Sequence, residues 1–147
     1  MNTGTETTIG FGLDLIELER FRAAWHRHGD RFLERVFTDH ERQVCLRRRD
    51  PVPELAARFA AKEATFKAIG TGLREGVRWR DVEVHNAPSG RPYLRVSGRV
   101  AEIARSLGGR RLVVSLTHSA DTAAAQVMLM GTPGAIPWTE DLIDPEE

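Results

Sequence analysis

The segment ARFAAKEATFKAIGTG, residues 57–72, constrains the fold more than any other part of the chain. Leu55, Phe59, Phe66 and Ile69 recur at helical spacing, and glycines end the run. This pattern predicts one long helix with an apolar face, which must be covered by other elements of the fold. The rest of the chain therefore has to supply a surface that packs against this helix.

The same helix holds an unusual choice of basic residues. The chain contains nineteen arginines but only two lysines, Lys62 and Lys67, and both lie in this segment. Either residue serves on a solvated surface, but only lysine provides a compact cation with an adjustable pKa. The distribution indicates that these are two positions where arginine cannot substitute. Lys62 lies within the apolar stripe, which suggests packing at an interface.

Alternation and turn signals predict the remaining elements. The fold expected from their order is α+β and single-domain, with a mainly antiparallel sheet packed with one long and several short helices. Residues 1–7 are expected to be a flexible N-terminus, residues 8–130 the domain and residues 131–147 an acidic tail. The predicted elements are a strand from residue 8 running into a helix over 17–28, a helix from the Thr38/Glu41 capping box to about Arg49, a hairpin of 79–85 and 93–97, a helix over 99–108, and strands over 111–119 and 123–130.

Composition excludes several classes of protein. No apolar run reaches membrane-spanning length, and the N-terminus lacks the pattern of a signal peptide. One cysteine, Cys45, permits no internal disulfide. From these three observations together we expect a cytoplasmic protein with no membrane association. The formal net charge is +0, but residues 17–49 are basic and the tail is acidic. The basic part suits an acidic partner, whereas a nucleic-acid binder would also need exposed aromatic residues and net basicity.

Two carboxylates stand out as candidate metal ligands. Asp14 follows Gly10 and Gly12 near the predicted end of the first strand, between two leucines, where an unpaired carboxylate is costly to bury. Glu63 lies on the long helix. Mg²⁺ is typically held by one or two carboxylates, with phosphate and water oxygens completing its shell. The alternative for Asp14 is the N-cap of the helix that follows.

Three short segments are weaker candidates for phosphate contacts. Residues 115–119 (SLTHS) place His118 beside several hydroxyl groups, and the segments 70–72 (GTG) and 89–93 (SGRPY) carry glycines that allow close approach to a ligand. Each also has an ordinary structural interpretation as a strand end or a turn. No zinc-ligand spacing, Walker loop or nucleophile elbow is present.

Four blocks of sequence together resemble one family. GFGLDLIELERF, RFAAKEATFKAIGTG, SGRPYL and VSLTHS occur in the order and at the spacing typical of the holo-acyl-carrier-protein synthases, the small type I 4′-phosphopantetheinyl transferases. The resemblance covers about residues 8–130. It implies a pantetheinyl-transferase-like fold and transfer of 4′-phosphopantetheine from coenzyme A to a serine of an apo-acyl carrier protein. The products implied are the holo-carrier and 3′,5′-ADP.

The resemblance also implies roles for individual residues. Asp14 and Glu63 match the family's Mg²⁺ ligands and Lys67 its lysine beside the pyrophosphate, so these three are the expected catalytic residues. It further implies a homotrimer with each active site at a subunit interface. The remaining matches are coenzyme A contacts at Arg58, Gly70, Thr71, Gly72, Arg91, Pro92, Ser115, Thr117 and His118, and a carrier-docking surface at Arg20, Arg31 and Arg35.

The chemistry implied is attack of a serine oxygen on the phosphoryl group attached to pantetheine. Glu63 is the candidate base, and Lys67, held by Glu63, would stabilise charge on the leaving group. Whether Glu63 or Lys67 takes the proton stays open, as does the use of acyl-coenzyme A. Arg91 stands where many relatives have Lys, and the acidic tail has no counterpart. The alternatives are the same reaction on a polyketide or peptide carrier, or a catalytically silent carrier-binding protein.

Overall fold

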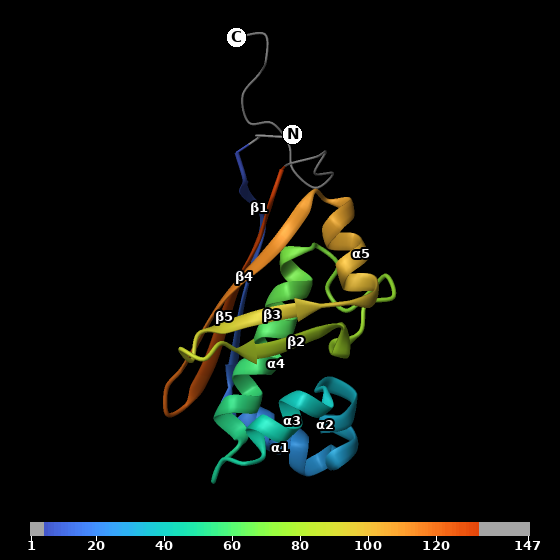
Figure 1. Cartoon of the computed structure of the whole chain (residues 1–147). Helices are drawn as coiled ribbons and strands as arrows, with labels where there is room; N and C mark the ends of the chain where they lie inside the picture. The colour runs from blue at the N-terminus through green and yellow to red at the C-terminus, as the bar shows by residue number, and fades with distance from the viewer. Residues whose placement is uncertain (1–4, 133–147) are drawn as a thin grey trace, which may run out of the picture.

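The computed structural model describes residues 5–132, which form an α+β fold around two antiparallel ladders. The larger sheet has the order β1-β5-β4, and the second is the hairpin of β2 and β3 (Figure 1). The strands are β1 (Thr7–Glu17), β2 (Val82–Asn86), β3 (Pro92–Val96), β4 (Gly109–His118) and β5 (Thr122–Gly131). The helices are α1 (Leu18–His28), α2 (Asp30–Val36), α3 (Asp39–Cys45), α4 (Val52–Ala68) and α5 (Gly98–Ser106), with a 3-10 turn η1 at Trp79–Asp81.

The predicted long helix is α4, and it lies across the inner face of β1 and β5. The contact is made largely by small residues: Ala60, Ala61, Ala64 and Ala68 of α4 pack with Ala125 of β5 and neighbouring valines. Because these side chains are single methyl groups, the helix and the sheet approach each other closely. The spacing between β1 and α4 is therefore fixed by backbone and methyl contacts rather than by long side chains.

Gly10 and Gly12 lie where β1 approaches the α4 backbone most closely. A Cβ atom at Gly10 would lie 2.2 Å from the Ala68 carbonyl oxygen, and one at Gly12 would lie 2.0 Å from that of Ala64. Both distances are far below van der Waals contact. Only glycine therefore permits β1 to lie directly against α4 at these two positions.

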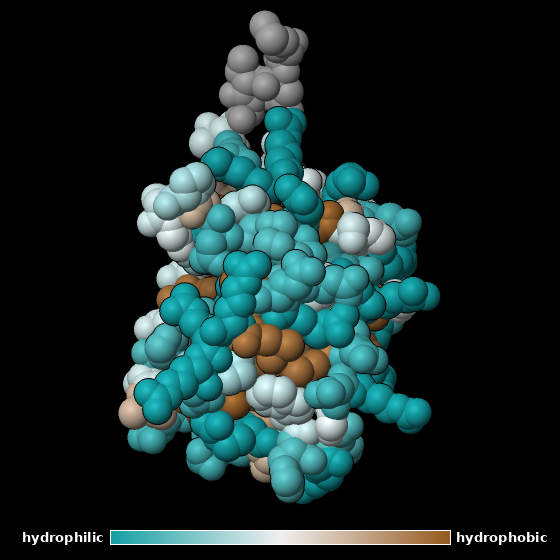
Figure 2. All heavy atoms as spheres, turned by 60° about the horizontal axis from the view of Figure 1, so that its bottom comes forward, coloured by the Kyte–Doolittle hydropathy of each residue, from teal (hydrophilic) through white to brown (hydrophobic). Residues whose placement is uncertain are grey.

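One end of the molecule is a small helical layer formed by α1, α2 and α3 (Figure 1). Phe21, Phe32 and Phe59 form an aromatic cluster between these helices and α4. The predicted capping box at Thr38 and Glu41 is present. Figure 2 looks toward this end, where the surface is mainly hydrophilic around a patch of hydrophobic atoms.

Several predicted boundaries change in the structure. Helix α2 was not predicted, and α3 ends at Cys45 rather than near Arg49. Strand β1 continues to Glu17, so α1 begins one residue later than expected. The 79–81 part of the predicted strand is the turn η1. The hairpin, α5 and the two last strands confirm the predicted order of elements.

The two predicted terminal segments extend beyond the described part of the chain. Strand β1 starts at Thr7, and Glu6 forms an ion pair with Arg111 at 2.7 Å. Strand β5 ends at Gly131, and residues 133–147 of the predicted acidic tail lie outside the described residues. Within residues 5–132, none of the helices combines the length and the apolar character needed to cross a bilayer.

Candidate active site

Asp14 lies in the middle of β1 rather than at its end, opposite Ala125 of β5. Its side chain faces α4 and is 8% exposed. The N-cap of α1 is Glu17, so the capping alternative for Asp14 is wrong. Among the described residues, the buried Oδ2 atom has no hydrogen-bond partner. A buried carboxylate oxygen without a partner is costly, and a bound cation would satisfy it.

Glu63 projects from α4 next to Asp14. Burial and, next, the neighbouring Asp14 carboxylate together raise the pKa of Glu63 to about 7, and the Lys67 ammonium group opposes this shift. Two adjacent carboxylates that resist simultaneous ionisation are suited to a divalent cation, which favours the charged form of both. The described residues contain no group of three or more acidic, histidine or cysteine side chains placed to hold a metal. A pair of carboxylates such as Asp14 and Glu63 is a donor set that suits Mg²⁺, which takes its other ligands from substrate and water oxygens.

Lys67 completes this cluster, one turn beyond Glu63. Its Nζ atom donates to the Leu13 carbonyl oxygen at 2.9 Å and to Asp14 Oδ1 at 3.2 Å. The expectation that Glu63 holds Lys67 is wrong, because the structure gives this ion pair to Asp14. The side chain is 53% exposed, so the ammonium group is accessible to a ligand while β1 fixes its position. Residues Gly70, Thr71 and Gly72 begin three positions after Lys67, and the Gly70 amide donates to the Lys67 carbonyl oxygen.

A hollow of about 410 Å³ opens beside Asp14 and Glu63. Arg20 of α1 lines it, so one of the predicted docking arginines lies next to the two carboxylates. The rest of the wall is mainly apolar and includes Phe21, Phe32 and Phe59. The sequence analysis did not assign these aromatic residues to the site, because their helical spacing indicates only a core face. Arg31 and Arg35 are exposed on α2.

Arg58 lies in the interior and not at an open phosphate site. It is 3% exposed, and its guanidinium group bonds Glu54 Oε2 and Asn86 Oδ1, both at 3.0 Å. Asn86 in turn donates to the Gly90 carbonyl oxygen in the hairpin turn. In the described chain, Arg58 therefore ties α4 to the turn that carries Arg91.

Lys62 also lies in the interior, which corrects its expected placement at an interface. It is 0% exposed and forms an ion pair with Glu41 at 2.7 Å. Its Nζ atom also donates to the carbonyl oxygens of Trp79 and Val82. Burial lowers the pKa of Lys62, and the Glu41 carboxylate opposes that shift. Lys62 is therefore a structural cation that joins α4 to α3, η1 and the start of β2.

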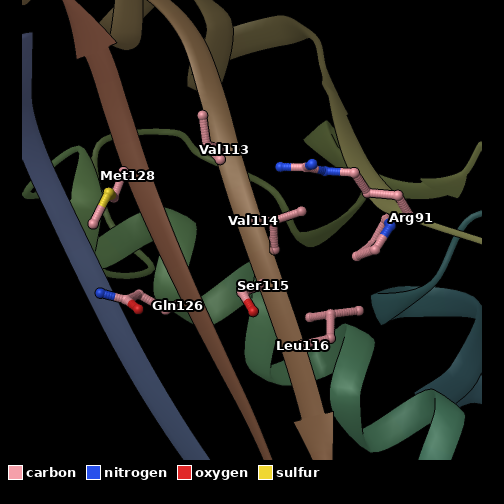
Figure 3. A pocket seen from close by; sticks show the side chains of 8 residues that line it. Arg91, Val113, Val114, Ser115, Leu116, Gln126 and Met128 are labelled. Carbon is pink, nitrogen blue, oxygen red and sulfur yellow. The ribbon is translucent and has the colours of Figure 1, made fainter.

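The remaining predicted contacts lie elsewhere on the chain. A hollow of about 400 Å³ is lined by Arg91, Pro92 and Ser115, together with β4 and β5 side chains that include Gln126 and Met128. Figure 3 shows Arg91 reaching from the hairpin toward the β4 residues Val113 and Val114. Thr117 and His118 are exposed at the end of β4. One chain thus carries two separate groups of candidate site residues.

Comparison with known proteins places this arrangement in a family. Residues 10–124 match the model of the 4′-phosphopantetheinyl transferase superfamily. The chain belongs to this superfamily. It is 46% identical to the holo-[acyl-carrier-protein] synthase of Koribacter versatilis over 121 residues, which are 82% of this chain and 97% of that protein.

Solved structures of phosphopantetheinyl transferases agree with the fold. The holo-[acyl-carrier-protein] synthase of Neisseria meningitidis superposes with a TM-score of 0.78 at 31% identity, covering 84% of this chain and 98% of that one. The enzyme of Bacillus anthracis, solved in complex with CoA (3′,5′-ADP), gives a TM-score of 0.71 at 35% identity, with coverage of 85% and 98%. The resemblance to holo-acyl-carrier-protein synthases inferred from the four sequence blocks is therefore confirmed.

Proposed function

We propose that this protein transfers 4′-phosphopantetheine from coenzyme A to a serine of an apo-acyl carrier protein, giving the holo-carrier and 3′,5′-ADP in an Mg²⁺-dependent reaction. The observation that carries the proposal is the cluster of Asp14, Glu63 and Lys67. In this cluster a buried carboxylate oxygen without a partner among residues 5–132, a carboxyl group with a raised pKa and an accessible ammonium group lie side by side. Related enzymes solved with coenzyme A, from Bacillus anthracis and Helicobacter pylori, support the choice of donor.

The side chains fit the steps of phosphoryl transfer. When bound by Asp14 and Glu63, Mg²⁺ would neutralise charge on the pyrophosphate. Glu63 is our candidate for the base that takes the serine proton, because its carboxyl group lines the hollow beside Asp14 and Arg20. Lys67 then donates hydrogen bonds to the leaving phosphate oxygens from a position fixed by Leu13 and Asp14.

The two separate groups of site residues support a shared active site. We propose that the protein is a homotrimer in which Asp14, Glu63, Lys67 and residues 70–72 of one subunit face Arg91, Pro92, Ser115, Thr117 and His118 of another. Arg58 would act through the hairpin turn. The outer face of the sheet exposes Phe11, Leu13 and Leu15 at 68%, 62% and 68%. An apolar sheet face of this kind marks a protein interface.

The carrier is proposed to dock on α1 and α2. Arg20, Arg31 and Arg35 are exposed there, and Arg20 lines the hollow beside the two carboxylates. Basic residues at this position would guide an acidic partner so that its serine approaches Glu63. The free, buried thiol of Cys45 fits a reducing compartment, which supports a cytoplasmic location.

Intact-mass spectrometry of an apo-acyl carrier protein tests the proposal directly. The carrier is incubated with this protein, coenzyme A and Mg²⁺, and parallel samples contain EDTA or the Glu63→Gln variant. A phosphopantetheine-sized mass gain that both controls abolish is the expected result. No gain with a panel of fatty-acid, polyketide and peptide-synthase carriers, while coenzyme A still binds, would identify a silent carrier-binding protein instead.

A further inference from the structure

A groove between α5, β3 and β4 lies outside the proposed active site. It has a volume of about 270 Å³ and an apolar floor that includes Leu94, Val96 and Leu112. These three side chains are only partly buried against the core cluster beneath them. The groove therefore exposes apolar surface that a further segment could cover.

The rim of this groove is strongly basic. Arg105, Arg110 and Arg111 line it. Arg111 pairs with Glu6, whereas Arg105 and Arg110 form no ion pair within residues 5–132. Apolar floor and basic rim together specify an occupant with apolar side chains and negative charge.

The chain's own C-terminal segment begins at this groove. Gly131 is the register partner of Gly109, which lines the groove, and the Thr132 amide donates to the Gly108 carbonyl oxygen at 3.1 Å. The segment that follows, PGAIPWTEDLIDPEE, combines Ile136 and Trp138 with five acidic residues and no basic residue. Its composition is the one that the groove specifies.

The length of chain available is sufficient. Glu140 lies eight residue steps after Thr132, which in extended conformation span up to roughly 26 Å. Arg110 follows Gly109 directly in β4, so the basic rim lies within a few residues of the point where the segment starts. The apolar residues come before the acidic ones, so they meet the groove first.

We propose that residues 133–147 bind in this groove of their own subunit. The 136–138 part covers the apolar floor, and Glu140 and Asp141 pair with Arg105 and Arg110. The contact is intramolecular and independent of the transferase reaction. The groove is separate from the proposed active site, because none of the residues that line the groove lines either hollow of that site.

Hydrogen exchange of the full-length protein, followed by mass spectrometry, tests this contact. The reference is a synthetic peptide of residues 133–147. In the intact protein, amides of this segment should exchange at least about fivefold more slowly than in the peptide. The Arg105→Glu/Arg110→Glu variant should bring their exchange close to the peptide rate, and 0.5 M salt should act in the same direction. Arg27→Glu, at an exposed position on α1, is the matched charge-reversal control and should leave the exchange unchanged.

A charge swap separates direct pairing from general damage to the fold. Glu140→Arg/Asp141→Arg alone should also raise exchange of the segment, and combining it with Arg105→Glu/Arg110→Glu should restore slow exchange. Exchange at the peptide rate in the unmodified protein would overturn the proposal. So would slow exchange that neither charge-reversal variant changes.

Discussion

The Lys62 ammonium group and the Glu41 carboxylate form an ion pair of 2.7 Å in which both side chains are 0% exposed. Glu41 also accepts from the Thr38 and Val84 amides, so the pair joins α3, α4 and β2. Lys62 donates to one carboxylate and two backbone carbonyls, which uses the three donors of an ammonium group. A planar guanidinium group would present its donors in a different geometry, which explains why this arginine-rich chain has lysine here.

Removing this cation should destabilise the protein strongly. Lys62→Met leaves the Glu41 carboxylate buried without its partner, and we expect a loss of about 3–5 kcal/mol in the free energy of unfolding. Lys62→Arg should also lose stability, because the pocket is matched to a compact group. Urea denaturation of the three proteins measures this. If Lys62→Met unfolds at the same urea concentration as the parent, the buried pair does not contribute as described.

The Asp14–Glu63 pair should make stability depend on pH in the absence of metal. Because folding raises the pKa of Glu63 to about 7, its contribution to stability is present below pH ~4.5 and is lost as the pH rises through 7. In EDTA, Glu63→Gln should therefore be more stable than the parent at pH 8, by about 1–2 kcal/mol after allowance for solvent screening. At pH 4.5 the two should be equal. Thermal melts at both pH values, with and without Mg²⁺, measure the difference, and an equal melting temperature at pH 8 would contradict it.

Lys67 should matter for transfer and little for folding. Its side chain is half exposed, so in the presence of Mg²⁺, which would satisfy the Asp14 carboxylate, Lys67→Ala should keep the melting temperature within about 3 °C of the parent. The rate of carrier modification should fall by about 10²-fold or more. Lys67→Arg should recover only part of this loss, because its planar group cannot occupy the same position beside Asp14. Full activity of the arginine variant would show that only the charge is needed.

Gly12→Ala should disrupt the site through the backbone. The added methyl group would overlap the Ala64 carbonyl oxygen and push β1 away from α4, two residues before Asp14. We expect about 1–3 kcal/mol of destabilisation, together with weaker Mg²⁺ binding measured by calorimetry. Gly10→Ala is the matched comparison, since it has a similar clash farther from Asp14. Equal Mg²⁺ affinity in the two variants would show that the contact of Gly12 with α4 has no specific effect on the metal site.

Charge reversal on α2 should weaken binding of the carrier only. Arg31→Glu/Arg35→Glu should raise the KM for an acidic carrier at least about tenfold, leave the KM for coenzyme A unchanged, and lose its effect at high salt. Arg99→Glu, at an exposed position on α5, is the control. An increase in the KM for coenzyme A would contradict this prediction, because it would indicate that these arginines take part in binding coenzyme A.

The sequence was sufficient for the elements whose local pattern is strong. Helix α4, the hairpin and the Thr38 capping box follow from periodicity, turn residues and side-chain chemistry within a few positions. Placement across the fold was harder. The helical pattern does not distinguish Lys62 from Lys67. In the structure, Lys62 forms an ion pair with Glu41, and Lys67 forms one with Asp14. Which partner each one finds depends on strands distant in sequence, so the assignment of Lys67 to Glu63 was wrong.

The site residues show the same limit. The four sequence blocks named Asp14, Glu63 and Lys67 together, and the structure brings these three into contact. Arg91 and Ser115 line a different hollow of the same chain from the one beside Asp14 and Glu63. This separation in space cannot be predicted from the positions of the residues in the sequence. The aromatic wall beside Asp14 was also missed, because Phe21, Phe32 and Phe59 carry the signature of an ordinary core.

The alanine contact between α4 and the sheet has a consequence for how this protein can change over time. Methyl groups already at closest packing leave no room for larger side chains, so substitutions at Ala60, Ala64 or Ala125 would move the two carboxylates apart. The exposed surface of α1 and α2, where we propose that the carrier docks, carries no such restriction. New carrier preferences can therefore evolve, or be engineered, on that surface while the catalytic geometry is inherited unchanged.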